Sequence, residues 1–99
     1  MNSPADRAIE QIPAAIAYIA DKWVYFLETL PLKDNVPLKE KIQLFFMPAE
    51  AALKAKFSIF DTAAGNGLVL LIVCKAVEAS GTHPAYEIEQ AMSLTLPQL

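Results

Sequence analysis

The first half of the chain carries two stretches in which apolar residues recur every three or four positions. The first, in residues 14–30, consists of Ile16, Ile19, Trp23, Phe26, Leu27 and Leu30. The second, in residues 38–57, consists of Leu38, Ile42, Phe45, Ala49, Ala52, Leu53 and Phe57. Polar residues such as Asp21, Glu28, Glu40 and Lys54 occupy the opposite positions. This period is that of an amphipathic α-helix, so both stretches are predicted to be helices that bury one face.

Prolines mark where these two helices begin, end and bend. The first helix is predicted to begin at Ser3-Pro4 and to end at Pro31, and the second to begin at Pro37. Pro13 and Pro48 fall inside the helical patterns. A proline there removes a backbone donor and clashes with the carbonyl four residues earlier. We therefore expect the first two helices to be kinked at Pro13 and Pro48.

The third stretch places Gly65-Asn66-Gly67 directly before seven apolar residues, Leu68 to Cys74. A phosphate-binding loop would need a lysine and a hydroxyl residue after the glycines, and neither follows. A buried strand stays open for residues 68–74, because β-branched residues favour strands. We favour a single helix that begins near Ser58, Asp61 or Thr62 and ends at Ser80-Gly81. Its glycines would allow another helix to approach the backbone closely.

A fourth helix is predicted near the end of the chain. Thr82 or His83 would cap it, and Pro84 would lie in its first turn. Its inner face would be formed by Ile88, Ala91 and Met92. The fold class is therefore all-α: a small bundle of four main helices that forms a single helical domain over residues 1–99.

The apolar content points to a second buried surface. Apolar residues make up 55% of the 99 residues, and mean hydropathy is +0.33. This is more apolar side chain than one small core requires. We therefore expect a homodimer. The candidate interface comprises the far side of the third helix, together with two tyrosines on the polar side of the first: Val69, Val73, Ala76, Tyr18 and Tyr25.

The residues that usually carry chemistry are scarce. The chain has one histidine, His83, and one cysteine, Cys74. A metal site needs several such ligands, and a catalytic histidine needs a partner. We therefore expect the protein to have no enzymatic activity and to bind no metal and no cofactor. The net charge is −3, which does not favour nucleic acid. The apolar run is too short to cross a bilayer, and the N-terminus does not resemble a signal peptide.

These observations predict a non-enzymatic, cytoplasmic module that acts by protein–protein interaction as a homo-oligomer, with a further protein partner. An alternative is a module that binds a small apolar ligand in an aromatic pocket lined by Trp23, Phe45, Phe57, Gly65 and Gly67. A third hypothesis is a helix-turn-helix-like regulator. Glu87 and Glu89 argue against it, because they would place negative charge on the helix that meets the phosphates.

Overall fold

Helices make up all the regular secondary structure in residues 4–29 and 35–98, the part of the chain that the computed structural model describes. The all-α prediction is thus confirmed for these residues. The elements follow the order α1 (Pro4–Thr29), α2 (Leu38–Lys56), the 3-10 turn η1 (Ser58–Asp61), α3 (Ala63–Asn66), α4 (Val69–Ala79) and α5 (Ala85–Met92). The expected N-cap at Ser3 and the end at Pro31 lie outside the described residues.

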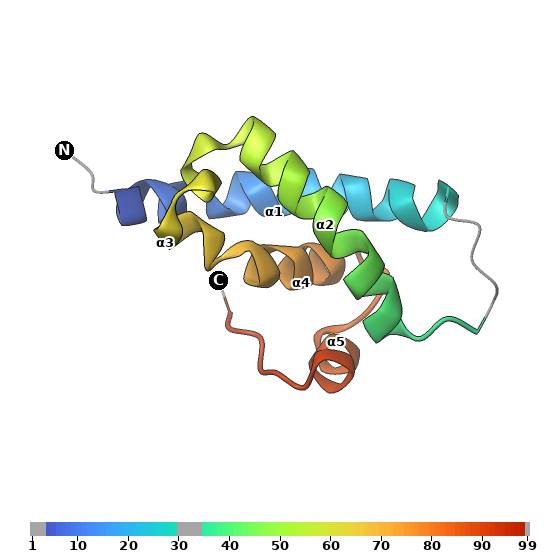
Figure 1. The fold of residues 1–99 in the computed structure, drawn as a ribbon. Helices are drawn as coiled ribbons and strands as arrows, with labels where there is room; N and C mark the ends of the chain where they lie inside the picture. The colour runs from blue at the N-terminus through green and yellow to red at the C-terminus, as the bar shows by residue number, and fades with distance from the viewer. Residues whose placement is uncertain (1–3, 30–34, 99) are drawn as a thin grey trace.

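The two long helices form one side of the molecule, and α4 lies against them (Figure 1). Helix α4 packs mainly against α1, and it also contacts α2 and α5. The short helix α5 contacts α2 and α4 and closes the other side. The assembly is elongated, with principal extents of 48 × 25 × 20 Å.

The core lies where α1, α2 and α4 meet. Its largest fully buried side chains come from every segment except α3: Trp23, Phe60, Ile19, Ile42, Leu53, Ile72 and Ile88. Among the described residues, no polar or charged residue is buried. Burial of apolar surface is therefore the main stabilising contribution to this fold.

Helices α1 and α2 run through their internal prolines without a break. Pro13 and Pro48 both lie inside continuous helices, and both are exposed. A proline on the solvent side leaves the carbonyl that it deprives of a donor within reach of water, which lowers its cost. The kinks themselves remain predictions.

The predicted third helix is wrong as a single element. Thr62, one of the caps considered, does cap a helix: its Oγ1 accepts a hydrogen bond from the Gly65 N–H at 3.1 Å. That helix, α3, ends after four residues, and α4 begins separately at Val69. The strand considered for residues 68–74 is also wrong, because 69–79 is helical.

Gly65 explains why this segment folds tightly. A Cβ atom at Gly65 would lie 2.1 Å from the carbonyl oxygen of Ile59 and 2.6 Å from Cα of Phe60. The expected close backbone approach therefore exists. The approaching element is the preceding turn η1, however, and not another helix.

The candidate interface on this segment needs correction. Val69, Val73 and Ala76 are 1%, 0% and 0% exposed within a single chain. Because α1, α2 and α5 all pack against α4, those side chains fill the core of the protomer and do not face a second subunit. The partly exposed side of α4 carries Leu70 and Leu71 instead.

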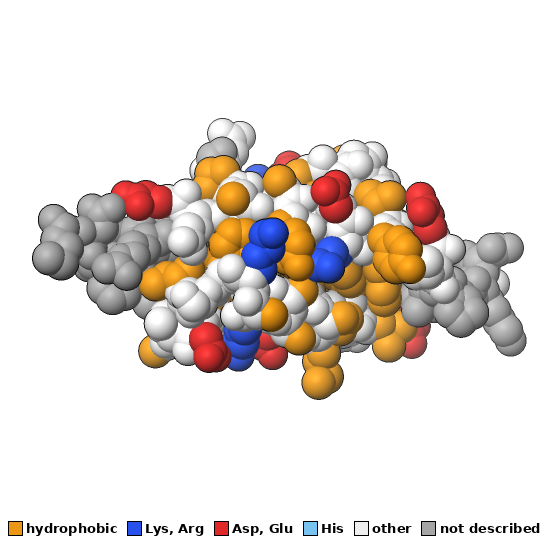
Figure 2. All heavy atoms as spheres, turned by 90° about the horizontal axis from the view of Figure 1, so that it is seen from above, with side chains coloured by type: hydrophobic (Ala, Val, Ile, Leu, Met, Phe, Trp, Pro, Cys, Tyr) orange, Lys and Arg blue, Asp and Glu red, His pale blue; other side chains and the backbone are white. Residues whose placement is uncertain are grey.

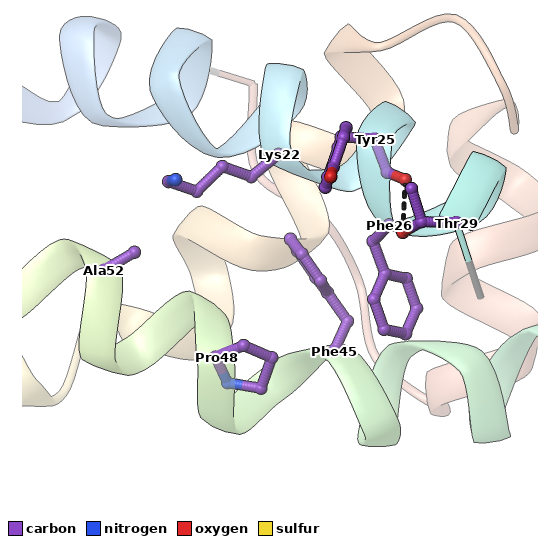
Figure 3. A pocket seen from close by; sticks show the side chains of 7 residues that line it. All are labelled: Lys22, Tyr25, Phe26, Thr29, Phe45, Pro48 and Ala52. Carbon is purple, nitrogen blue, oxygen red and sulfur yellow. Dashed lines mark hydrogen bonds between the residues drawn. The ribbon is translucent and has the colours of Figure 1, made fainter.

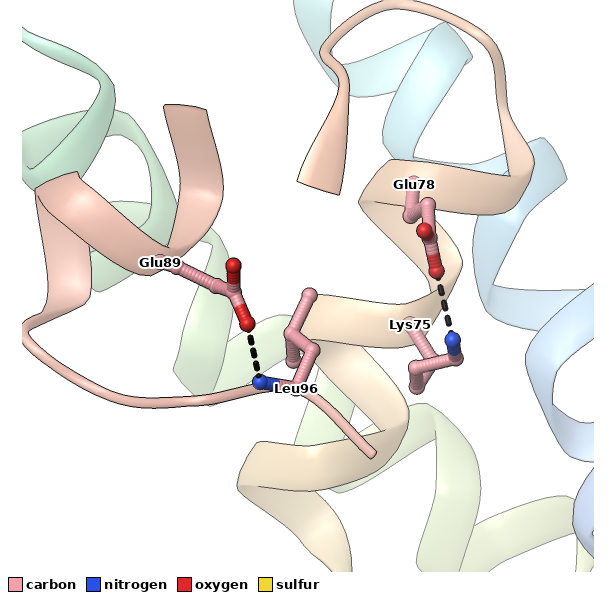
Figure 4. A network of polar contacts seen from close by, with 4 residues as sticks. All are labelled: Lys75, Glu78, Glu89 and Leu96. Carbon is pink, nitrogen blue, oxygen red and sulfur yellow. Dashed lines mark hydrogen bonds and ion pairs between the residues drawn. The ribbon is translucent and has the colours of Figure 1, made fainter. Parts of the chain in front are cut away.

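Helix α5 begins one or two residues later than predicted, since its N-cap is Pro84 and not Thr82 or His83, and it has no side-chain cap. It ends at Ser93, which adopts a left-handed conformation with φ of 55°. The chain then turns back toward α4. The Leu96 N–H donates a hydrogen bond to Oε2 of Glu89 at 2.7 Å, and Lys75 pairs with Glu78 on α4 (Figure 4).

Candidate functional site

Helix α2 carries a second apolar face that is open to solvent. Its exposed residues lie three, four, seven and eleven positions after Leu44, which is the helical spacing of a single face. The full set is Leu44, Met47, Pro48, Ala51 and Ala55. We call this set the outer stripe. Leu44 is 51% exposed and Met47 is 76% exposed. Because the core-facing side of the same helix already buries Ile42, Phe45, Ala49 and Leu53, α2 is apolar on two sides.

A groove between α1 and α2 borders the outer stripe at Pro48. It has a volume of about 250 Å³ and is lined by Lys22, Tyr25, Phe26, Thr29, Phe45, Pro48 and Ala52. Figure 3 shows the aromatic side chains of α1 and α2 converging on this space. The rings of Phe26 and Phe45 lie 5.0 Å apart. Drug-sized ligands usually occupy roughly 300–1,000 Å³, so this groove suits one or two apolar side chains better than a cofactor.

Tyr25 forms the exposed rim of the groove. It is 67% exposed, and its backbone carbonyl accepts a hydrogen bond from the Thr29 hydroxyl at 2.9 Å. The sequence had suggested Tyr25 as an interface residue, and its exposure leaves it available for contact. An exposed tyrosine beside an apolar groove is typical of binding surfaces, where this residue type is enriched.

Tyr18 lies differently. It is half-buried, and its ring packs edge-on against Phe57 with centroids 5.9 Å apart. The ammonium groups of Lys22 and Lys56 lie 4.8 and 4.7 Å from the Tyr18 ring centre. Two cations on one ring stabilise this arrangement by cation–π attraction. Tyr18 therefore joins the two helices together, in contrast to the freely exposed Tyr25.

Figure 2 shows the molecule from above, with the side chains coloured by type. Hydrophobic side chains gather along its middle, lysines lie among them, and acidic side chains lie toward the edges. On α2 the ammonium of Lys54 lies 4.0 Å from Oε2 of Glu50, with both side chains about one-third exposed. Such an exposed pair contributes little to stability, so Lys54 stays available to an external carboxylate.

The five residues predicted to line one aromatic pocket do not converge. Phe45 alone lines the α1–α2 groove. Trp23 is fully buried against it, with ring centres 5.2 Å apart. Phe57 packs against Tyr18 and Phe60. Gly65 is closed off by η1.

Gly67 belongs to a second hollow, also of about 250 Å³, under the C-terminal segment. It is lined by Gly67, Leu70, Leu71, Cys74, Leu94, Thr95, Leu96 and Pro97. Residues from the protein's own C-terminal segment thus cover this part of α4. The predicted pocket is therefore divided between two hollows and the core.

Two residue types that often take part in chemistry, cysteine and histidine, occur once each in the chain. Burial raises the pKa of the Cys74 thiol from 9.0 to about 11, which keeps it protonated and unreactive near neutral pH. The Nδ1 atom of His83 lies 3.0 Å from the Thr82 hydroxyl. In residues 4–29 and 35–98, no three potential metal ligands lie together. Within the same ranges, no helix combines the length and apolar character that a membrane span requires.

The outer stripe is not among the predicted site residues, although its spacing is visible in the sequence. The spacing of Leu44, Met47 and Ala51 is as regular as that of the buried face. One apolar face is enough to predict an amphipathic helix, so the pattern does not by itself distinguish a second apolar face. No protein family matches the chain, and no curated protein or solved structure is significantly similar to it.

Proposed function

We propose that this protein is a non-enzymatic interaction module that acts as a homo-oligomer in the cytoplasm and binds a further protein partner. One observation carries the proposal: α2 buries one apolar face in the core and exposes another, the outer stripe, beside the α1–α2 groove. Covering an exposed Leu or Met side chain contributes about 1.5–3 kcal/mol. The outer stripe therefore favours association.

The shape of this surface supports protein binding. The outer stripe is a straight row on one helix, and the groove beside it is shallow enough for single side chains. A helix laid into an apolar groove is a common mode of protein recognition, with anchor residues at the same spacing as the stripe itself. Tyr25 at the rim supplies a large contact area with little conformational freedom to lose.

A small apolar ligand is the second candidate. The observation that favours it is the aromatic lining of the groove, where Phe26 and Phe45 lie side by side. Its limited volume argues for a fragment the size of a single ring. A nucleic-acid regulator receives no such support, since Glu87 and Glu89 both lie on α5.

Sedimentation velocity over a wide concentration range tests the proposal. The wild type is expected to form dimers as concentration rises, and Met47→Glu is expected to weaken association at least tenfold. Tyr86→Glu is the matched control, because Tyr86 is 63% exposed but lies on α5. Both variants should keep the wild-type circular dichroism spectrum. A wild type that stays monomeric at the highest concentration, or a Tyr86→Glu effect as large as that of Met47→Glu, would contradict the proposal.

A further inference from the structure

We infer that two copies of this chain associate through α2 in an antiparallel arrangement that crosses near Met47 and Pro48, so that Leu44 of each copy enters the α1–α2 groove of the other. This inference rests on the proposed function and specifies the partner and its register. The groove is then a site completed by a residue from the second copy.

Two-fold symmetry brings Leu44 of one copy close to Ala51 of the other. In an antiparallel pair, a residue before the crossing point lies opposite one that follows it by the same distance. For a crossing at Met47 the exact counterpart of Leu44 is residue 50, so Ala51 of the other copy lies one residue, about 1.5 Å along the helix axis, from Leu44. Ala51 is small and lies on the helix surface next to Pro48 and Ala52, two residues that line the groove. A large side chain thus meets a small one beside an open space of about 250 Å³.

Met47 lies at the crossing point itself. Its side chain is 76% exposed, the largest exposed fraction among the large hydrophobic residues described. In the antiparallel pair, Met47 of one copy meets Met47 of the other. Methionine adapts its shape readily to such self-contacts, because its side chain is unbranched and flexible.

Charge decides between antiparallel and parallel pairing. Glu40 and Lys54 are fourteen residues apart in the sequence, close to four full helical turns, so they lie on the same flank of the outer stripe. Antiparallel pairing about Met47 places Glu40 of each copy opposite Lys54 of the other. A parallel two-fold pair would instead place this flank of the two copies on opposite sides of the interface, so that Glu40 and Lys54 would not meet. Only the antiparallel pair therefore gains these attractions between opposite charges.

The rim of the groove fits the same arrangement. Tyr25 stands on the α1 side, across the groove from Pro48 (Figure 3). A Leu44 side chain entering from the second copy would lie between them, against Phe45 at the base. Phe45 is only 2% exposed, so the groove has a rigid floor. The incoming side chain would thereby be surrounded by apolar atoms on three sides.

Disulfide trapping tests the direction of the pairing. A disulfide requires Cα atoms within about 7 Å of each other. A mixture of Leu44→Cys and Ala51→Cys proteins should cross-link efficiently under mild oxidation, whereas Leu44→Cys alone should not. The native Cys74 is 0% exposed and does not interfere, and the wild type serves as the control. Cross-linking of Leu44→Cys alone, as strong as that of the mixture, would show parallel pairing and overturn the inference while leaving the proposed function intact.

Charge reversal tests the register. Glu40→Lys and Lys54→Glu should each raise the dimer dissociation constant by about three- to tenfold, in keeping with exposed ion pairs that occur twice per dimer. The double variant should return close to the wild-type value. Lys39→Glu is the matched control, since Lys39 is exposed but lies farther from the outer stripe.

The outcomes separate the two levels of the hypothesis. Suppose that Met47→Glu weakens the wild-type dimer, but that the double charge-reversal variant does not regain the wild-type dissociation constant. This result would overturn the register alone. A wild type that native mass spectrometry detects only as a monomer, with or without a small bound molecule in the groove, would overturn both the inference and the proposed function.

Discussion

The indole N–H of Trp23 donates a hydrogen bond of 2.9 Å to the hydroxyl of Thr82, which lies 59 residues later in the sequence. This bond connects the C-terminal part of α1 to the turn between α4 and α5. Thr82 is held in turn by Ser80 and His83, whose Oγ and Nδ1 atoms lie 2.8 and 3.0 Å from its Oγ1. The turn therefore positions an acceptor for the one polar atom of a fully buried indole.

Removing that acceptor should destabilise the fold. Thr82→Val keeps the shape of the side chain but leaves the indole N–H without its partner, which costs about 1–3 kcal/mol of unfolding free energy. Thr82→Ser keeps the hydroxyl and is expected to remain within about 0.5 kcal/mol of the wild type. Urea unfolding followed by tryptophan fluorescence measures both. Equal stability of the two variants would show that the bond contributes nothing.

Gly65→Ala should destabilise the protein strongly. The added methyl group would clash with the backbone of Ile59 and Phe60, neither of which can move like a flexible side chain. We expect a loss of about 3 kcal/mol or more, in the range of severe strain. Gly67→Ala is the control, because Gly67 is exposed and has helical dihedral angles of −69° and −12°. It should be neutral or slightly stabilising. Thermal unfolding measures both variants. A melting temperature of Gly65→Ala equal to that of the wild type would contradict this account.

The buried thiol should make stability depend on pH in the alkaline range. The folded protein holds the Cys74 proton with a pKa of about 11, whereas the unfolded chain releases it near 9.0. Below pH 9 both states keep the proton, so the contribution is complete. Between pH 9 and 11 the unfolded state loses its proton first, and stability falls by on the order of 2 kcal/mol.

Comparison with Cys74→Ala isolates this effect, because the two proteins differ only in the side chain at position 74. Chemical denaturation at pH 8 and at pH 10.5 should show a steeper loss of stability for the wild type. A thiol reagent should also fail to label native wild type at pH 8 until denaturant is added. Identical pH dependence in the two proteins would mean that Cys74 is not buried in the folded state.

The sequence by itself determined where the long helices lie. The second helix was expected to open at Pro37 and to carry Phe57 on its apolar face, and the structure places α2 at Leu38–Lys56, with Phe57 as its C-cap. These boundaries follow from local chemistry: proline restricts the backbone next to it, and the apolar period is that of the helix. The buried face of α2 was predicted for the same reason, through Ile42, Phe45 and Leu53.

Only the tertiary structure decided which apolar residues are covered. In the run 69–77 nearly every residue is apolar, so periodicity cannot rank its sides, and Val73 and Leu70 look alike in the sequence. Packing of α1, α2 and α5 around α4 buries Val73 completely and leaves Leu70 40% exposed. Packing also explains why the outer stripe is exposed. Both faces of α2 are apolar, but the neighbouring helices cover only one of them. Burial depends on contacts between distant segments, whereas the local sequence pattern shows only which residues are apolar and could therefore be buried.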